Sequence, residues 1–277
     1  MSPRAFYGAW TILLVAMAPV AAAAPVDCSS AFSRIFGKPT ADIRLVFGYK
    51  DARPARFVGD RYERMMVIRR LMAPCVADQS VCGFRRDPGD AELFLKDIPG
   101  ETGDTTVRLR VVASSAGPDD DANREDPFQS WLSRRAEQVF LSGLQFADVV
   151  FYLGHSRSGG GPDFTPPRLD SAQHADYAWY KAQAPGLKRM LESLARADIP
   201  PRWIGLFSCV SERHFLEAST KALPRSVRGE VGFITSDRLL YYWDSLQNAL
   251  AALSAVLGKR CEPALSGAVY GDAQAGP

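Results

Sequence analysis

The chain has little net charge and few histidines, and these two scarcities exclude whole classes of function. Its 33 Lys and Arg nearly balance 31 Asp and Glu over 277 residues, which gives a formal net charge of +2. Nucleic acids and anionic membranes attract proteins with a clear basic excess, so neither is an expected partner. The histidines, only three in number, limit metal sites and acid–base chemistry to a few positions: His155, His174 and His214.

Long apolar runs are missing beyond the first residues. Trp10 to Val20 is apolar, follows Arg4 and precedes four alanines, which is the pattern of an export signal with small residues for cleavage. The run is shorter than the ~20 residues of a membrane span. We therefore expect 1–24 to be a signal peptide, and the mature protein to be soluble in the periplasm or secreted, with no membrane association. Its removal leaves 32 basic against 31 acidic side chains.

Apolar stretches and helical patterns alternate along the rest of the chain. This alternation predicts a mostly parallel sheet with helices on both faces, within one α/β domain over residues 25–262. The Gly- and Ala-rich tail, 263–277, is expected to be disordered. Strands are expected at 44–49, 107–113, 148–154, 203–209 and 231–235, with a strand or hairpin arm at 92–98. Helices are expected at 61–72, 127–146, 175–197 (kinked at Pro185-Gly186), 211–223 and 239–257.

The five cysteines all lie in the exported part, where an odd number leaves at least one thiol unpaired. Cys75 and Cys82 bracket a short polar segment and are natural partners. Cys28 and Cys261 lie near the two ends of the domain, and such ends often lie close together. Connectivity is not determined by sequence alone, but these pairings leave Cys209 as the free cysteine.

Cys209 and His155 each follow a strongly apolar run. Cys209 ends the run 203–209, and His155 comes directly after 148–154. The carboxyl ends of parallel strands are where α/β sheets build their sites, so the two side chains are expected to meet as nucleophile and base. A helix beginning after Cys209 favours the thiolate, and the backbone amides of Ser156 and Cys209 are candidate donors to an oxyanion. The bland alternative is a buried thiol and an ordinary loop histidine.

Other polar residues support weaker hypotheses. Ser156 lies in a sequence close to the serine nucleophile elbow, but the second glycine of that motif is replaced by Ser158. His214 is an alternative base. Asp163 and Asp237 are candidate substrate-binding residues for a basic side chain. A metal site at His155, Asp163, Asp170 and His174 has no recognised spacing, and the glycines at 159–161 lack the Lys-Ser/Thr of a phosphate loop, so no metal or cofactor is implied.

The segments 149–155 and 204–209 resemble the caspase–gingipain–legumain superfamily of cysteine peptidases. Its members carry a catalytic His after one hydrophobic strand and a catalytic Cys after the next. The resemblance spans about residues 42–258 and implies a caspase-like three-layer sandwich, with His155 as general base or acid and Cys209 as nucleophile. Two residues depart from the family pattern: Ser156 replaces a usual Gly, and Ser208 replaces a small residue that is often Ala.

The sequence thus favours an exported cysteine endopeptidase that acts on peptide or protein substrates through a Cys209–His155 dyad. Two alternatives remain at this stage. One is a non-catalytic binding or scaffold protein that keeps the fold, and the other is a serine hydrolase that uses Ser156. The oligomeric state, the cleavage-site preference and any need for processing are not encoded in a readable pattern.

Overall fold

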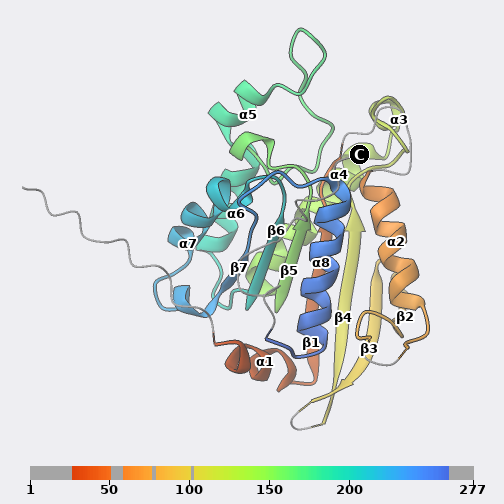
Figure 1. Ribbon diagram of the computed structural model, residues 1–277. Helices are drawn as coiled ribbons and strands as arrows, with labels where there is room; N and C mark the ends of the chain where they lie inside the picture. The colour runs from red at the N-terminus through yellow and green to blue at the C-terminus, as the bar shows by residue number, and fades with distance from the viewer. Residues whose placement is uncertain (1–26, 51–58, 77–78, 101–102, 262–277) are drawn as a thin grey trace, which may run out of the picture.

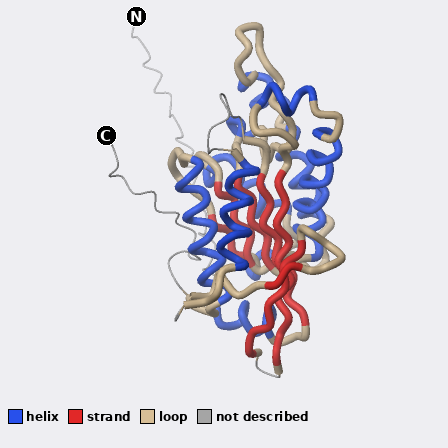
Figure 2. Tube along the Cα trace, turned by 90° about the vertical axis from the view of Figure 1, so that its right-hand side faces the viewer, coloured by secondary structure: helices blue, strands red, loops and turns tan. Residues whose placement is uncertain are grey.

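The computed structural model describes residues 27–50, 59–76, 79–100 and 103–261. The signal peptide predicted at 1–24 and the disordered tail predicted at 263–277 lie outside these ranges. The described part is an α/β fold with a central sheet between two layers of helices, as Figures 1 and 2 show from two directions. The mostly parallel sheet flanked by helices that the sequence predicts is confirmed.

The sheet has seven strands in the order β2-β3-β4-β1-β5-β6-β7. β4, β1, β5, β6 and β7 are parallel to one another, while β2 and β3 add an antiparallel edge beside β4. β5 and β6 are buried along their whole length, which explains their unbroken apolar sequence. The strands are β1 (Thr40–Phe47), β2 (Arg85–Arg86), β3 (Leu93–Pro99), β4 (Asp104–Ala113), β5 (Val149–Leu153), β6 (Trp203–Phe207) and β7 (Gly232–Ile234).

Each face of the sheet has its own apolar core. One core packs the sheet against α1, α2 and α8, and the other packs it against α4, α6 and the end of α7. Figure 1 shows α8 and α2 in front of the strands. The helices are α1 (Cys28–Phe36), α2 (Asp60–Met72), α3 (Asp120–Glu125), α4 (Gln129–Phe146), α5 (Tyr177–Gln183), α6 (Pro185–Ala195), α7 (Glu217–Ala222) and α8 (Tyr242–Leu257).

The order of the parallel strands reverses direction at the centre of the sheet. From β1 the chain continues to β4 on one side, then crosses to β5 and proceeds outward through β6 and β7 on the other. In open α/β sheets, ligand sites form outside the carboxyl ends of the strands at such a reversal. The carboxyl ends of β1 and β5 mark this place.

Three predicted helices differ from the observed ones. The helix predicted over 175–197 with a kink at Pro185-Gly186 is divided at that place into two helices, α5 and α6, because Ala184 adopts a left-handed conformation (φ 43°) before Pro185 starts a new helix. The last helix begins at Tyr242 rather than at 239, since the Asp244 carboxylate accepts a hydrogen bond from the Tyr241 amide at 3.1 Å and caps the helix there. The helix predicted at 211–223 opens with a π-helical turn over 212–216. Two short helices, α1 and α3, were not predicted.

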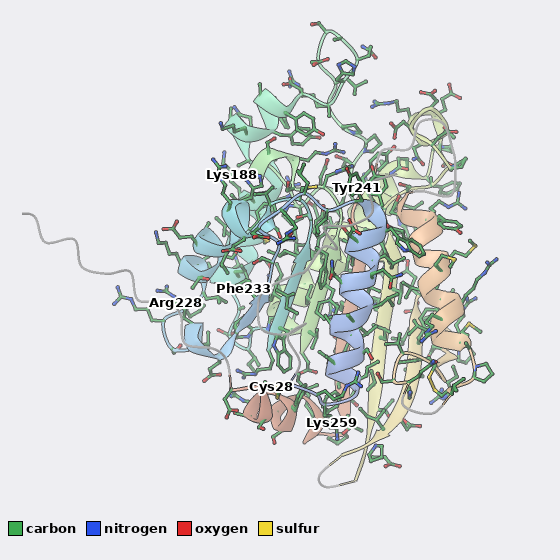
Figure 3. The ribbon with its side chains drawn as sticks, viewed as in Figure 1. Cys28, Lys188, Arg228, Phe233, Tyr241 and Lys259 are labelled. Carbon is green, nitrogen blue, oxygen red and sulfur yellow. A yellow bond between two sulfur atoms is a disulfide. The ribbon has the colours of Figure 1, made fainter. Side chains whose placement is uncertain are left out.

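The cysteine pairing inferred from the sequence is confirmed. Cys28 is bonded to Cys261, with 5.9 Å between their Cα atoms, and Cys75 is bonded to Cys82. Figure 3 shows Cys28 near Lys259, at the end of the molecule opposite Tyr241. Cys209 is the remaining, free cysteine. None of the helices within the described ranges has the length and apolar character to span a membrane.

Candidate active site

His155 and Cys209 follow the carboxyl ends of two neighbouring strands, at the same edge of the sheet. β5 and β6 pair in parallel, with Leu153 opposite Phe207 at the carboxyl end of the register. Each candidate residue lies two positions beyond its member of that last pair. Adjacent strands are separated by ~4.8 Å, so the sheet carries the two residues to equivalent positions on one edge. A hydrogen bond from the Gly154 amide to the Phe207 carbonyl, at 3.4 Å, continues the pairing one residue further.

The Cys209 thiol is half-buried and lies against the segment that precedes α8. Its Sγ is 3.4 Å from the carbonyl oxygen of Leu240, to which the thiol donates. The next residue, Val210, has a φ of 50°, which is a strained conformation for a β-branched side chain. Two backbone hydrogen bonds hold Val210 there, one from its amide to Arg238 and one from His214 to its carbonyl. Strain of this kind concentrates at functional sites.

Tyr242 at the start of α8 contacts His155. The Tyr242 hydroxyl lies 3.3 Å from His155 Nε2, within hydrogen-bond distance, and the two rings meet edge to face with centroids 5.8 Å apart. The buried hydroxyl of Tyr152, on β5, donates to the His155 carbonyl at 2.9 Å. The imidazole is therefore oriented by a side chain, and its backbone is tied to the strand that carries it.

The backbone amides of Ser156 and Cys209 have no hydrogen-bond acceptor among the residues that the structure describes. Both amides lie where their strands end, as the sequence predicted for an oxyanion site. The side chain of Ser156 is buried, and its backbone (φ −77°, ψ −16°) has ordinary right-handed helical geometry. A serine nucleophile elbow holds its serine on a strained, exposed turn, which Ser156 lacks.

The two aspartates predicted to bind substrate have different surroundings. Asp163 is buried and accepts a 2.8 Å hydrogen bond from Arg157, whose guanidinium also lies over the Tyr180 ring. This buried ion pair holds the loop after His155 together, so the Asp163 carboxylate already has a cation inside the protein. Asp237 is exposed and pairs with its neighbour Arg238 at 3.1 Å.

The other two histidines lie apart from this geometry. His214 belongs to the helix after Cys209, and its ring lies close to Gly159 of the His155 loop, where an added Cβ atom would be 3.2 Å from Nδ1. Burial and the neighbouring Arg213 both lower the pKa of His214. His174 is exposed in the loop before α5. Within the described ranges, no cluster of His, Cys, Asp or Glu is suited to hold a metal ion.

A buried cation lies beside the site at the end of β1. Lys50 is 2 % exposed, forms an ion pair with Glu63 of α2, and its Nζ lies 5.0 Å from the centre of the Tyr242 ring. Burial raises the pKa of Glu63, and the nearby Lys50 opposes that rise. Lys50 and Tyr242 thus connect the end of β1 with His155 at the end of β5, where the strand order reverses.

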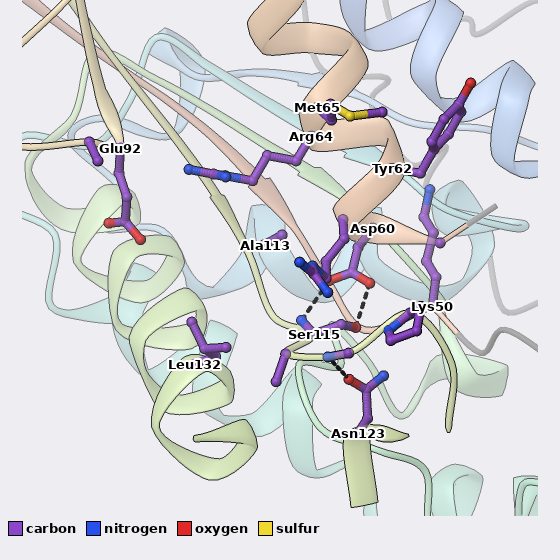
Figure 4. Close-up of a pocket in the computed structure, with 16 residues that line it drawn as sticks. Lys50, Asp60, Tyr62, Arg64, Met65, Glu92, Ala113, Ser115, Asn123 and Leu132 are labelled. Carbon is purple, nitrogen blue, oxygen red and sulfur yellow. Dashed lines mark hydrogen bonds between the residues drawn. The ribbon is translucent and has the colours of Figure 1, made fainter. Parts of the chain in front are cut away.

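A cavity of about 790 Å³ opens next to Lys50, between the start of α2 and the loop after β4 (Figure 4). Neither His155 nor Cys209 lines it. On its floor, the buried Asp60 carboxylate accepts hydrogen bonds from the amides and hydroxyls of Ser114 and Ser115. Burial raises the pKa of Asp60 against the effect of these bonds. The cavity and the Cys209 edge are therefore two separate features that share Lys50 as a neighbour.

The sequence predicted the placement of His155 and Cys209 but not the roles of Tyr242 and Lys50. The one available signal was position, because Lys50 is a charged residue three positions after the buried end of β1. Comparison of the chain with protein-family models, with curated proteins and with solved structures gives no match. The chemistry of the site is therefore inferred from its own geometry.

Proposed function

We propose that this protein is an exported cysteine peptidase of the caspase–gingipain–legumain type. The observation that carries the proposal is the placement of a free thiol and an imidazole at equivalent positions beyond two paired, parallel strands. A second support is the sheet order, in which His155 follows the third parallel strand along the chain and Cys209 follows the fourth. Two disulfides are compatible with an oxidising compartment.

In the proposed reaction, Cys209 transfers its proton to His155 and the thiolate attacks the scissile carbonyl carbon. The amides of Ser156 and Cys209, which lack internal acceptors, donate to the developing oxyanion. The imidazolium then protonates the leaving amine, and an acyl-enzyme forms on Sγ. Water, deprotonated by His155, releases the acid product and restores the thiol.

Val210 strengthens the case for a functional cysteine over a packing cysteine. A buried cysteine that merely fills space needs no strained neighbour, whereas a left-handed valine directly after Cys209 costs about 1–2 kcal/mol. Cys209 is also only half-buried. Ser156 is likewise followed by a left-handed residue, Arg157 (φ 47°), but it is buried, with an exposed fraction of 5 %.

The first test is the reactivity of the Cys209 thiol. Because the other four cysteines form disulfides, iodoacetamide should label the unreduced mature protein once, and Cys209→Ala should not be labelled. At pH 6 the wild type should react at least about tenfold faster than His155→Ala, because an imidazolium beside the sulfur favours the thiolate, which is the reactive form. Equal rates in the two proteins contradict the dyad.

The second test is hydrolysis itself. A denatured protein mixture incubated with the mature wild type should show new peptide termini by mass spectrometry, and these should be absent with Cys209→Ala. Cleavage that survives in Cys209→Ala but is lost in Ser156→Ala identifies the serine hydrolase instead. No cleavage by the wild type, together with an unreactive thiol, identifies a non-catalytic protein that keeps the fold.

A further inference from the structure

The cavity at the start of α2 has the size and the composition of a small-molecule site. Its volume of about 790 Å³ falls within the range of ~300–1,000 Å³ of ligand pockets. Apolar side chains from three elements line it: Met65 on α2, Ala113 at the end of β4 and Leu132 on α4. Figure 4 shows Arg64 reaching across the cavity toward the side where Glu92 lies, with Lys50 on the opposite side. Polar groups, among them Arg64, Glu92 and Lys50, thus line the same cavity as these apolar side chains.

Arg64 is the charged group in this cavity that the protein leaves incompletely bonded. It is half-buried, and its Nε donates to the Val111 carbonyl at 3.0 Å. Its two terminal nitrogens have no hydrogen-bond acceptor among the described residues. Burial lowers the pKa of Arg64, the like charges of Arg86 and Arg61 lower it further, and Glu92 opposes them. Burial destabilises the charged form of the guanidinium, and an anion bound here would stabilise that form.

The neighbouring charges are already compensated inside the protein. The Asp60 carboxylate accepts hydrogen bonds from two serines, and Lys50 pairs with Glu63. The Glu92 carboxylate pairs with Arg135 at 3.0 Å and with Arg110 at 3.5 Å, on its Oε2 atom. Among the described residues that line the cavity, Arg64 and the exposed Arg61 are the cations without an ion-pair partner.

The geometry points to a specific ligand: we propose that this cavity binds an organic carboxylate, whose carboxylate group pairs with Arg64 and whose apolar body lies against Met65, Ala113 and Leu132. A guanidinium presents its terminal nitrogens as a fork that matches a carboxylate. The nearby Glu92 disfavours a dianion such as phosphate, so a single negative charge fits better. The carboxylate comes either from a free small acid or from an acidic peptide side chain. This site is independent of the proposed peptidase function.

The proposal is tested by calorimetric titration of the mature protein with three matched probes. N-acetyl-L-phenylalanine carries a free carboxylate, N-acetyl-L-phenylalaninamide carries none, and N-acetyl-L-phenylalanyl-L-glutamic acid α-amide carries it on a side chain. The free acid, the side-chain acid or both should bind at least about tenfold more tightly than the amide. Whichever acid binds more tightly identifies the source. Affinity should fall as salt is raised, because the attraction is partly electrostatic.

Variants locate the site. Arg64→Gln should weaken binding of the acids about tenfold or more, whereas Arg70→Gln, which removes the same charge from an exposed position on the same helix, should leave it unchanged. Met65→Trp places bulk at the partly exposed wall of the cavity and should abolish binding without altering any charge. Cys209→Ala should bind like the wild type, which separates this result from the fate of the peptidase proposal.

Equal affinity for acid and amide, or no binding of any probe, overturns the proposal. So does an Arg64→Gln variant that binds as well as Arg70→Gln. Loss of the hydrogen bond to Val111 is a structural cost of Arg64→Gln, so its thermal unfolding is compared with that of the wild type. If that variant does not fold, unchanged binding by Met65→Trp is sufficient to refute the site.

Discussion

Replacing Tyr242 by phenylalanine removes one contact of the proposed dyad. The substitution removes the hydroxyl that lies 3.3 Å from His155 Nε2. It keeps the edge-to-face contact of the two rings and the position of Lys50 Nζ over the ring. The fold around α8 should therefore persist, while the orientation of the imidazole loosens.

The expected size of the effect follows from that distance. A net hydrogen bond contributes about 0.5–1.5 kcal/mol, and 3.3 Å is longer than the ~2.8 Å usual for a hydroxyl, so the lower half of this range applies. A loss of about 0.5–1 kcal/mol corresponds to a rate that is about 2- to 5-fold lower. His155→Ala removes the imidazole altogether and should have a larger effect.

The assay is the rate of Cys209 alkylation by iodoacetamide between pH 5 and 9. Tyr242→Phe should lower the rate near pH 6 by about 2- to 5-fold. Tyr241→Phe is the matched control, because Tyr241 is the adjacent residue and its side chain is 80 % exposed. A profile for Tyr242→Phe that overlays the wild type, or an equal decrease in the control, refutes the positioning role.

Three further predictions concern stability. The Ser208 hydroxyl is buried without a partner in the described structure, so Ser208→Ala should raise the free energy of unfolding by about 1 kcal/mol in urea titrations; a decrease would show that the hydroxyl is satisfied. The Cys28–Cys261 bridge spans 233 residues, and replacing both of its cysteines should lower the free energy of unfolding by about 5 kcal/mol. The Cys75–Cys82 bridge spans 7 residues, and its loss should cost about 2 kcal/mol. Equal losses for the two bridges contradict the dependence on loop length. Burial raises the pKa of Asp60 above 3.8, so the folded protein keeps this proton where the unfolded chain has lost it. Its contribution to stability is fully present below about pH 3.8 and is lost as the pH rises through the folded-state pKa, by at most ~1.4 kcal/mol per pH unit. Asp60→Asn should reduce the decrease of stability with rising pH, measured by thermal unfolding between pH 4 and 7. If the slope is the same in the variant and the wild type, Asp60 does not cause the decrease.

Patterns local in the sequence were enough for most of the strands and helices. The run 203–209 is apolar without interruption, which is typical of a strand buried on both faces, and β6 is such a strand. The helical pattern of α1 was present too, since Ala31, Phe32, Ile35 and Phe36 are buried at helical spacing, but nine residues are a short signal. Pro185 marked the break between α5 and α6 in the sequence, but the left-handed conformation of Ala184 was not predictable from an alanine.

The contacts that orient the site could not be predicted in this way. Tyr242 and His155 are 87 residues apart in the chain, and nothing in the local pattern around either residue encodes the other. Lys50 follows a strand that is adjacent to β5 only because the sheet reverses direction between them. The same applies to Asp163, whose carboxylate is occupied by Arg157 through a turn that composition alone shows only as a flexible loop.

The amino-acid sequence by itself determined the alternation of strands and helices, the free cysteine and the strand ends at which Cys209 and His155 lie. These follow from periodicity and from cysteine counting, which depend on near neighbours in the chain. The tertiary structure alone decided which strands are adjacent, that Tyr242 orients His155, and that Arg64 faces an apolar cavity. Those are contacts between distant segments, and they exist only after burial of the two apolar cores has placed the helices on the sheet.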